Sequence, residues 1–182
     1  MQIPIFPLNG AVLFPGTSLP LNIFEERYIE MVDYAFSKER CIGMIQTDEK
    51  NKLYNIGCVG KIHSFSETTD GRYLISLQGT NCFKVKKELE KEYKFRLIEA
   101  EILDFEEDKN LINEKQKNNL LEKYSQYIKV KNINLNLEEI QNIDFNQIIK
   151  FIAMISPFSD IEKQVLLETK NLSDFYILAI LI

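Results

Sequence analysis

The sequence predicts an α+β protein in which a β-rich half precedes a helical half. Up to about residue 105, apolar and polar side chains alternate in several short runs, and a period of two is typical of half-buried strands. From about residue 107 the alternation stops, and apolar residues recur at helical spacing in a stretch rich in Lys, Asn, Glu and Gln. We therefore expect a β subdomain at residues 1–106 and a helical subdomain at residues 107–182.

Composition is that of an ordinary soluble protein. The 182 residues are 45% hydrophobic and 27% charged, which suits one domain, or one domain with a small second one. The formal net charge of −5 argues against sequence-independent binding to nucleic acid, which needs clustered Lys and Arg, although a local basic patch is compatible with it.

Neither end of the chain carries a targeting or membrane signal. The N-terminus lacks the basic and apolar regions of a signal peptide, and the apolar run Phe175–Ile182 is too short to span a bilayer. The three cysteines, Cys41, Cys58 and Cys82, are widely spaced and form no C-x-x-C motif. The simplest interpretation is a reduced, cytoplasmic protein.

The N-terminal block reads as strand, turn, strand and helix. Pro4 and Pro7 enclose two apolar residues, and because proline has no N–H, this strand is expected at a sheet edge. Asn9-Gly10 and Pro15-Gly16 are turn signals. The apolar residues that follow have the spacing of one helix face; they are Phe24, Tyr28, Met31, Val32 and Ala35.

The rest of the β half is expected to form further strands. The Asp70-Gly71 pair suits a tight hairpin turn, and Gly79-Thr80-Asn81 is expected to break the chain between two strands. Near Ile98-Glu99 the parity of the apolar residues changes, which indicates a bulge or a bend. The expected strands are Cys41–Thr47, Ile56–Glu67, Arg72–Gln78, Cys82–Lys87 and Tyr93–Phe105.

Helix-start signals mark the second half. Two helices are expected to begin near residues 145 and 160, and a further helical pattern covers Asp108–Val130. The signals are two pairs at capping-box spacing, Asp144 with Gln147 and Ser159 with Glu162.

The N-terminal block resembles the substrate-binding N-terminal domain of the Lon protease family. That family shows P-x-F-P-L, then L-F-P-G, then L-P-L-x-I-F-E-x-R-Y, a long pattern at fixed spacing. The matching residues are Pro4, Phe6, Pro7, Leu8, Leu13, Phe14, Pro15, Gly16, Leu19, Pro20, Leu21, Ile23, Phe24, Glu25, Arg27 and Tyr28.

Later segments extend the resemblance over nearly the whole chain, most weakly at residues 110–142. It implies a PUA-like, mostly antiparallel, curled sheet with one or two helices, followed by a helical subdomain, as in stand-alone bacterial proteins that lack the ATPase and protease domains of Lon. The matching residues are Ile56, Gly57, Ile62, Asp70, Gly71, Gly79, Phe83 and Val85 in the β half, and Pro157, Glu162, Lys163, Leu166, Leu167 and Glu168 in the helical half.

Catalytic, metal and cofactor sites are not expected. His63 is the one histidine, and it lies within a predicted strand without a nucleophile context. Cys58 is five residues from His63, so the two side chains project to opposite faces of a strand and do not share a metal. The Gly57–Lys61 stretch has the wrong spacing for a phosphate-binding loop.

The candidate peptide-binding residues are Phe14, Pro15, Glu26 and Arg27. Phe14 and Pro15 lie at a turn, where an aromatic ring and a proline are hard to bury, and exposed apolar surface often marks a contact site. Glu26 and Arg27 follow on the first turn of the predicted helix. Two alternatives remain open: the motif packs a core, and Arg27 pairs with a nearby carboxylate that positions the helix.

By resemblance, the chain is expected to be a non-enzymatic module that binds unfolded or exposed polypeptide, or docks on a protein-quality-control partner in proteolysis. The first alternative is RNA binding, since PUA-like folds elsewhere bind RNA. The second is a small-molecule hydrolase. No cofactor or membrane partner is expected, nucleic acid is disfavoured by the acidic charge, and the oligomeric state is left open.

Overall fold

The computed structural model describes residues 1–90, 92–104, 115, 118–119, 121–123, 144–169, 171 and 173–176. Its strands are β1 (Gln2–Pro7), β2 (Ser18–Ile23), β3 (Cys41–Ile45), β4 (Ile56–Glu67), β5 (Tyr73–Leu89) and β6 (Arg96–Leu103). Its helices are α1 (Glu26–Phe36), α4 (Phe145–Ile155) and α5 (Asp160–Leu167). The expected boundary at 106/107 and most of the helical pattern at Asp108–Val130 lie outside the described residues.

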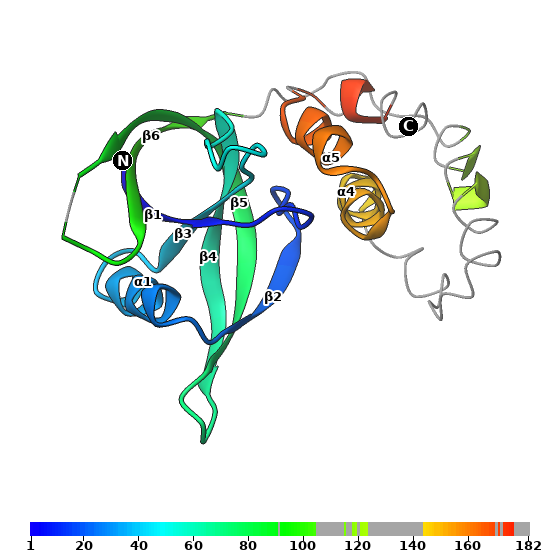
Figure 1. Ribbon diagram of the computed structural model, residues 1–182. Helices are drawn as coiled ribbons and strands as arrows, with labels where there is room; N and C mark the ends of the chain where they lie inside the picture. The colour runs from blue at the N-terminus through cyan, green and yellow to red at the C-terminus, as the bar shows by residue number, and fades with distance from the viewer. Residues whose placement is uncertain are drawn as a thin grey trace.

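The β half is a small closed barrel. The strand order is β2-β5-β4-β3-β1-β6, and an additional pairing of β5 with β6 closes a ring of five strands, while β2 extends from β5 outside the ring (Figure 1). β1 and β3 pair in parallel, and the other pairs are antiparallel. The expected mostly antiparallel, curled sheet is confirmed.

The strand β5 is long enough to serve both parts of the sheet. Its Tyr73–Gln78 segment pairs with β2, and its segment from Cys82 onward pairs with β6. The expected break at Gly79–Asn81 is instead a bulge within one strand, where the β4 pairing shifts by one residue. The last strand begins at Arg96 rather than Tyr93, and Phe105 lies outside the described residues.

Both prolines of β1 lie in an inner strand, which corrects the expectation of a sheet edge. Backbone hydrogen bonds show that the N–H and C=O groups of odd-numbered β1 residues point toward β6, and that those of even-numbered residues point toward β3. The Pro4 nitrogen therefore points toward β3, whose pairing begins only at Ile5, and the Pro7 nitrogen points toward β6, whose pairing ends at Ile5. Because each nitrogen lies beyond the end of its ladder, the missing N–H removes no sheet hydrogen bond.

Two apolar clusters share the strands. The Phe83 ring lies inside the barrel against glycines of β3 and β4, and a Cβ built on Gly57 would lie 2.5 Å from Phe83 Cζ. The irregularity expected near Glu99 is present as a register shift in the pairing of β5 with β6. The extra residue belongs to β5, where it is Lys86, and not to β6. The inner cluster is Ile3, Ile5, Ile45, Val59, Phe83, Ile98 and Ala100; the larger outer cluster joins the barrel to α1, α4 and α5.

Helix α1 covers one side of the barrel with the expected face. Tyr28, Met31, Val32 and Ala35 are buried. Phe24 was predicted on the same face, but α1 begins only at Glu26, so Phe24 precedes the helix and is 65% exposed.

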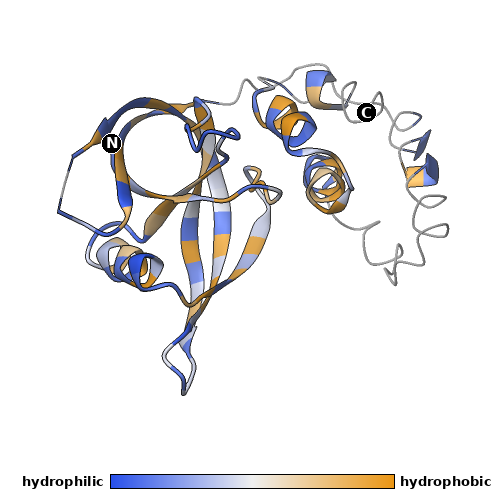
Figure 2. Cartoon of the chain, in the orientation of Figure 1, coloured by the Kyte–Doolittle hydropathy of each residue, from blue (hydrophilic) through white to orange (hydrophobic). Residues whose placement is uncertain are grey.

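The helices α4 and α5 begin where the capping signals predict. Asp144 accepts a hydrogen bond from the Asn146 N–H at 3.0 Å, so it caps α4 without the full box, whereas Ser159 and Glu162 form the reciprocal capping box of α5. The buried face of α4 is apolar, whereas α5 buries Lys163 and Gln164 together with Leu166 and Leu167; Figure 2 shows the hydropathy along both helices. Within the described part of the chain, no helix has the length and apolar character to cross a bilayer.

An ion pair ties β5 to β6. Arg96 donates through Nε to Glu88 Oε1 at 2.7 Å and through Nη2 to Oε2 at 2.8 Å. This hydrogen bonding lowers the pKa of the Glu88 carboxyl. The pair therefore stabilises the fold above the ordinary carboxyl pKa, and this contribution disappears as the pH falls through the lowered pKa of Glu88.

We expect Glu88→Gln to reduce stability at pH 7 by at most about 1 kcal/mol, because both side chains are partly exposed. At pH 3, the difference from the parent should be smaller. Urea titrations at both pH values measure it, with Glu92→Gln as a control from the same β5–β6 connection. A difference that grows on acidification contradicts the assignment.

Candidate binding surface

The loop between β1 and β2 lies between the barrel and the helical half. Within it, Phe14 is only 1% exposed, and its ring meets Phe175 edge to face with centroids 5.3 Å apart. The Thr17 hydroxyl donates to the Phe14 carbonyl at 2.8 Å and accepts from the Phe14 N–H at 3.2 Å. This burial corrects the expectation that Phe14 presents apolar surface and favours the packing alternative.

Two lysines attach the helices to the same loop. Lys150 of α4 donates to the Pro15 carbonyl at 3.2 Å, and Lys163 of α5 donates to the Gly10 carbonyl at 3.0 Å. Burial lowers the pKa of the Lys150 ammonium, while the neighbouring Cys82, Cys58 and Asp144 raise it. Pro15 thus belongs to the contact between the two halves.

A close backbone approach holds the loop on β5. The Gly16 N–H donates to the Gly79 carbonyl at 2.9 Å, and the Gly79 N–H donates to the Thr17 carbonyl at 2.8 Å. A Cβ built on Gly79 would lie 2.2 Å from the Phe14 carbonyl oxygen. The glycine that the sequence marked as a strand break is therefore required by the crossing loop.

Glu26 and Arg27 lie apart from Phe14 and Pro15, at the start of α1 and away from α4 and α5 (Figure 1). Arg27 Nη2 is 2.8 Å from Glu25 Oε2, and its guanidinium lies over the Tyr28 ring, 4.4 Å from the centroid. Glu26 pairs with Lys94. The contact of Arg27 with a carboxylate fits the positioning alternative, yet the side chains of Glu26 and Arg27 both remain exposed.

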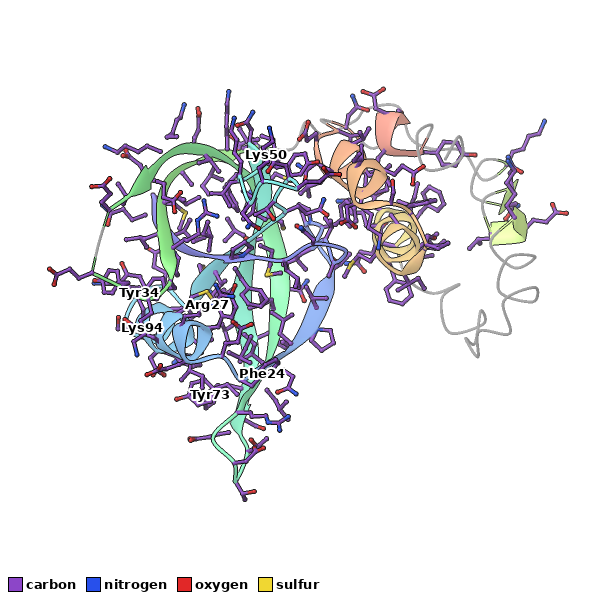
Figure 3. The ribbon with its side chains drawn as sticks, in the orientation of Figure 1. Phe24, Arg27, Tyr34, Lys50, Tyr73 and Lys94 are labelled. Atoms are coloured by element: carbon purple, nitrogen blue, oxygen red, sulfur yellow. The ribbon has the colours of Figure 1, made fainter. Side chains whose placement is uncertain are left out.

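Exposed apolar side chains gather where the β4–β5 hairpin leaves the barrel. Phe24 is 65% exposed, and Phe65 and Leu74 are each 43% exposed. Ile23, which precedes Phe24, is paired with Tyr73 of β5. We call Phe24, Phe65, Tyr73 and Leu74 the hairpin-end patch; Figure 3 shows Phe24 and Tyr73 at this end of the barrel, with Arg27 on the first turn of α1.

Contacts with α1 fix part of this patch. The Phe65 and Tyr73 rings meet edge to face at 5.0 Å, Phe36 meets Phe65 at the same distance, and the Tyr73 hydroxyl donates to Asp33 Oδ1 at 3.2 Å. The Leu74 side chain projects from the face of β5 opposite to that of Tyr73, because successive side chains of a strand alternate between its two faces. Two features of the sequence could have predicted these exposed side chains. Phe65 shares a strand face with polar residues, and Leu74 is out of phase with the apolar residues on either side of it.

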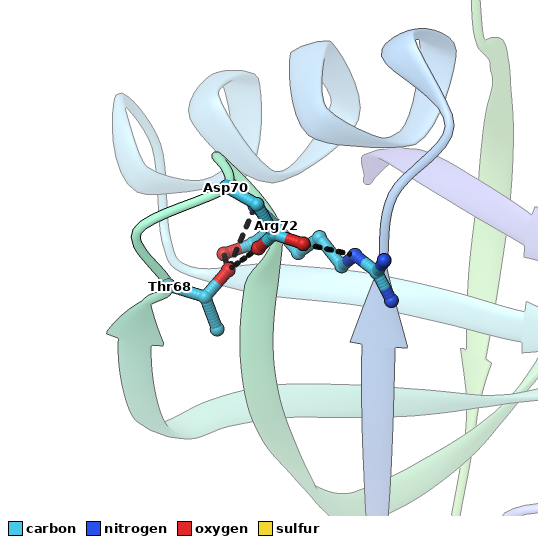
Figure 4. A network of polar contacts seen from close by, with 3 residues as sticks. All are labelled: Thr68, Asp70 and Arg72. Carbon is cyan, nitrogen blue, oxygen red and sulfur yellow. Dashed lines mark hydrogen bonds and ion pairs between the residues drawn. The ribbon is translucent and has the colours of Figure 1, made fainter.

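Side-chain hydrogen bonds and an ion pair link the residues of the hairpin turn. Thr68 donates to Asp70 and to the Arg72 carbonyl at 3.1 Å, and Arg72 Nε lies 2.8 Å from Asp70 Oδ2 (Figure 4). The Thr68 hydrogen bond is the main cause that lowers the pKa of Asp70. Gly71 has φ +80°, so the predicted Asp-Gly turn is confirmed.

The remaining candidates lie elsewhere. His63 is exposed on β4, while Cys58 of the same strand is buried. Lys86 and Lys87 of β5 pair with Glu101 and Glu99 of β6, so these two lysines lie on an inner strand with carboxylate partners. In the described ranges, no three His, Cys, Asp or Glu side chains group as metal ligands would.

The family model of the ATP-dependent protease La (LON) substrate-binding domain matches residues 2–178, so the chain belongs to the Lon substrate-binding domain family. It is similar to the Lon protease of Brevibacillus choshinensis, with 24% identity over 183 residues, or 95% of this chain and 23% of that protein. It is 30% identical to the Lon protease of Cytophaga hutchinsonii over 97 residues, or 50% of this chain and 12% of that protein. The chain thus spans a quarter or less of these relatives.

Two solved structures share the fold. A Lon N-terminal domain protein from Xanthomonas campestris superposes with a TM-score of 0.70 at 21% identity, covering 94% of this chain and 92% of that one. The N-terminal domain of the Mycobacterium avium complex Lon protease gives a TM-score of 0.74 at 14% identity, covering 99% and 96%. The expected fold, a curled sheet followed by helices, is therefore confirmed.

Proposed function

We propose that this chain is a non-enzymatic polypeptide-binding module that recognises unfolded or exposed polypeptide, or a protein-quality-control partner, through the hairpin-end patch. The observation that carries the proposal is the exposure of Phe24, which lies within the motif of the family at the entry to α1. Phe65 and Leu74 expose further apolar area at the same end of the barrel, Phe65 beside Tyr73 on one face of the β4–β5 hairpin and Leu74 on the other face. Exposed apolar side chains that cluster on a folded domain mark contact sites.

Side chains, rather than backbone, supply the contacts in this proposal. β2 is the edge strand, and the hydrogen bond from the Gly79 N–H to the Thr17 carbonyl sets its odd-numbered residues toward β5. The backbone N–H and C=O groups of even-numbered residues therefore point to the free edge, where Pro20 has no N–H to offer; these residues are Ser18, Pro20 and Asn22. Addition of a partner strand is disfavoured there.

Charged neighbours of the patch orient the bound chain. Arg27 and Glu26 each hold an exposed ion-pair partner, and exposed pairs contribute little to stability, so they exchange readily for a charge on a substrate. Apolar contact supplies most of the affinity. Because unfolded chains offer scattered apolar side chains, binding should tolerate sequence variation and have a Kd in roughly the micromolar range or weaker.

We expect Phe24→Ser and Arg27→Glu each to weaken binding by at least about fivefold, or ~1 kcal/mol. The ligand is a reduced and alkylated protein that cannot refold, and fluorescence anisotropy measures Kd. Ile161→Ser is the matched control, since Ile161 is 66% exposed but lies on α5, and it should bind like the parent.

Circular dichroism must show that all three variants are folded. If Phe24→Ser and Arg27→Glu bind as tightly as the parent, the proposed surface is wrong. A gel-shift assay with RNA at low salt separates the RNA-binding alternative, for which we expect no shift.

A further inference from the structure

Two cysteines lie side by side on adjacent strands of the barrel. Cys58 of β4 and Cys82 of β5 are directly paired in the antiparallel ladder, and both side chains lie on the outer face toward α4 and α5. The Val85 N–H donates to the Asn55 carbonyl at 2.9 Å, and alternation from this pair makes 58/82 a non-hydrogen-bonded pair. In such pairs the Cα atoms are about 4.5 Å apart, within the roughly 4.4–6.8 Å that a disulfide spans.

The two thiols differ in access. Cys58 is fully buried, whereas Cys82 is half-buried and lines a cavity of about 150 Å³ together with Pro15, Leu103 and Thr169. The Cys82 thiol is also directed to the Leu167 carbonyl, 3.7 Å away at the end of α5. A small reagent can therefore reach Cys82 first, with Cys58 directly behind it.

We propose that Cys58 and Cys82 form a reversible cross-strand disulfide by exchange with a small-molecule disulfide of the glutathione type. The Cys82 thiolate attacks one sulfur of the small disulfide, forms a mixed disulfide and releases one small thiolate, which takes up a proton. Cys58 then loses its proton and attacks the Cys82 sulfur, which releases the second small thiol. Two protein thiols are oxidised, and one small disulfide is reduced to two thiols.

The surroundings of the thiols set the rate of the first step. Burial raises the pKa of Cys82 to about 11, and the Lys150 ammonium on α4 acts in the opposite direction. Burial also raises the pKa of Cys58, with Cys82 as a further cause, while Lys150 and a backbone hydrogen bond at Thr80 lower it. Glu168 and Asp104 line the same cavity. Exchange should therefore be slow at neutral pH and accelerate about tenfold per pH unit toward pH 11.

Oxidation would change the contact between barrel and helices. The bond would remove the Cys82 sulfur from the Leu167 carbonyl and would fix the β4–β5 register beside the bulge. Closing the chain between residues 58 and 82 restricts the unfolded state, so the midpoint of thermal unfolding should rise by roughly 5–10 °C.

The test uses the full chain with Cys41→Ser, which removes the third thiol. We incubate it with oxidised glutathione at pH 8.5, alkylate it under denaturing conditions and map the peptides by mass spectrometry. The expected product is a Cys58–Cys82 peptide pair that dithiothreitol separates.

Single variants order the steps and keep the outcome decisive. With Cys58→Ser, Cys82 should retain one glutathione, and with Cys82→Ser, Cys58 should stay unmodified. The proposal is overturned if both thiols are still alkylated after equilibration, or if the parent accumulates the mixed disulfide at Cys82 without closing the pair.

Discussion

Replacing Phe14 by Ala should destabilise the protein by about 3–5 kcal/mol, because a fully buried aromatic ring leaves a cavity that its surroundings fill only in part. The ring lies between barrel and helices, against Phe175, so its loss weakens the contact between the two halves as well as the core. For a chain of this size, the midpoint of thermal unfolding should fall by roughly 10–15 °C.

Phe24→Ala is the matched control, since it removes the same side chain from the same motif at an exposed position. It should change stability by less than about 0.5 kcal/mol. Urea and thermal unfolding followed by circular dichroism measure both variants. If Phe14→Ala is as stable as Phe24→Ala, the packing interpretation of the motif is wrong.

Gly79→Ala is the second substitution with a large expected effect, a loss of about 3 kcal/mol or more. The new methyl group would lie 2.2 Å from the Phe14 carbonyl oxygen, and this oxygen belongs to backbone that is itself hydrogen-bonded to Thr17. Neither strand nor loop can move aside without breaking the bonds that Gly79 makes with Gly16 and Thr17.

Gly60→Ala provides the comparison for this substitution. Its nearest contacts would be Leu13 Cδ2 at 2.9 Å and Leu77 Cβ at 3.0 Å, which are side-chain atoms rather than backbone and lie farther away than 2.2 Å, so we expect a smaller loss. Chemical denaturation of both variants under the same conditions decides the ranking. Equal losses would show that the loop backbone adapts and that the close approach at Gly79 is not required.

Local signals predicted the elements whose structure is determined locally. The capping box at Ser159 and Glu162, the Asp70-Gly71 turn and the strand Ile56–Glu67 are all present as expected. Each rests on hydrogen bonds or alternation within a few residues.

Contacts between distant segments account for what the sequence did not predict. Phe14 read as an exposed turn aromatic because Phe175, which covers it, lies far along the chain. Gly79 read as a strand break because the loop that crosses it comes from the N-terminal block. For the candidate surface, Arg27 was found from the motif, but only strand pairing brings the segments that carry Phe65 and Leu74 to the end of β2, where Phe24 follows.

The closed ring of strands also sets the order in which the molecule can fold. β1 needs both β3 and β6 as neighbours, and the Met1 amino group donates to the Ala100 carbonyl at 2.6 Å. The ring therefore closes only after the chain has brought together segments almost a hundred residues apart, which is typical of proteins that fold in roughly milliseconds to seconds. Until then, unpaired strand edges remain open to other chains, so the nascent barrel is itself exposed to misassembly before its edges are sealed.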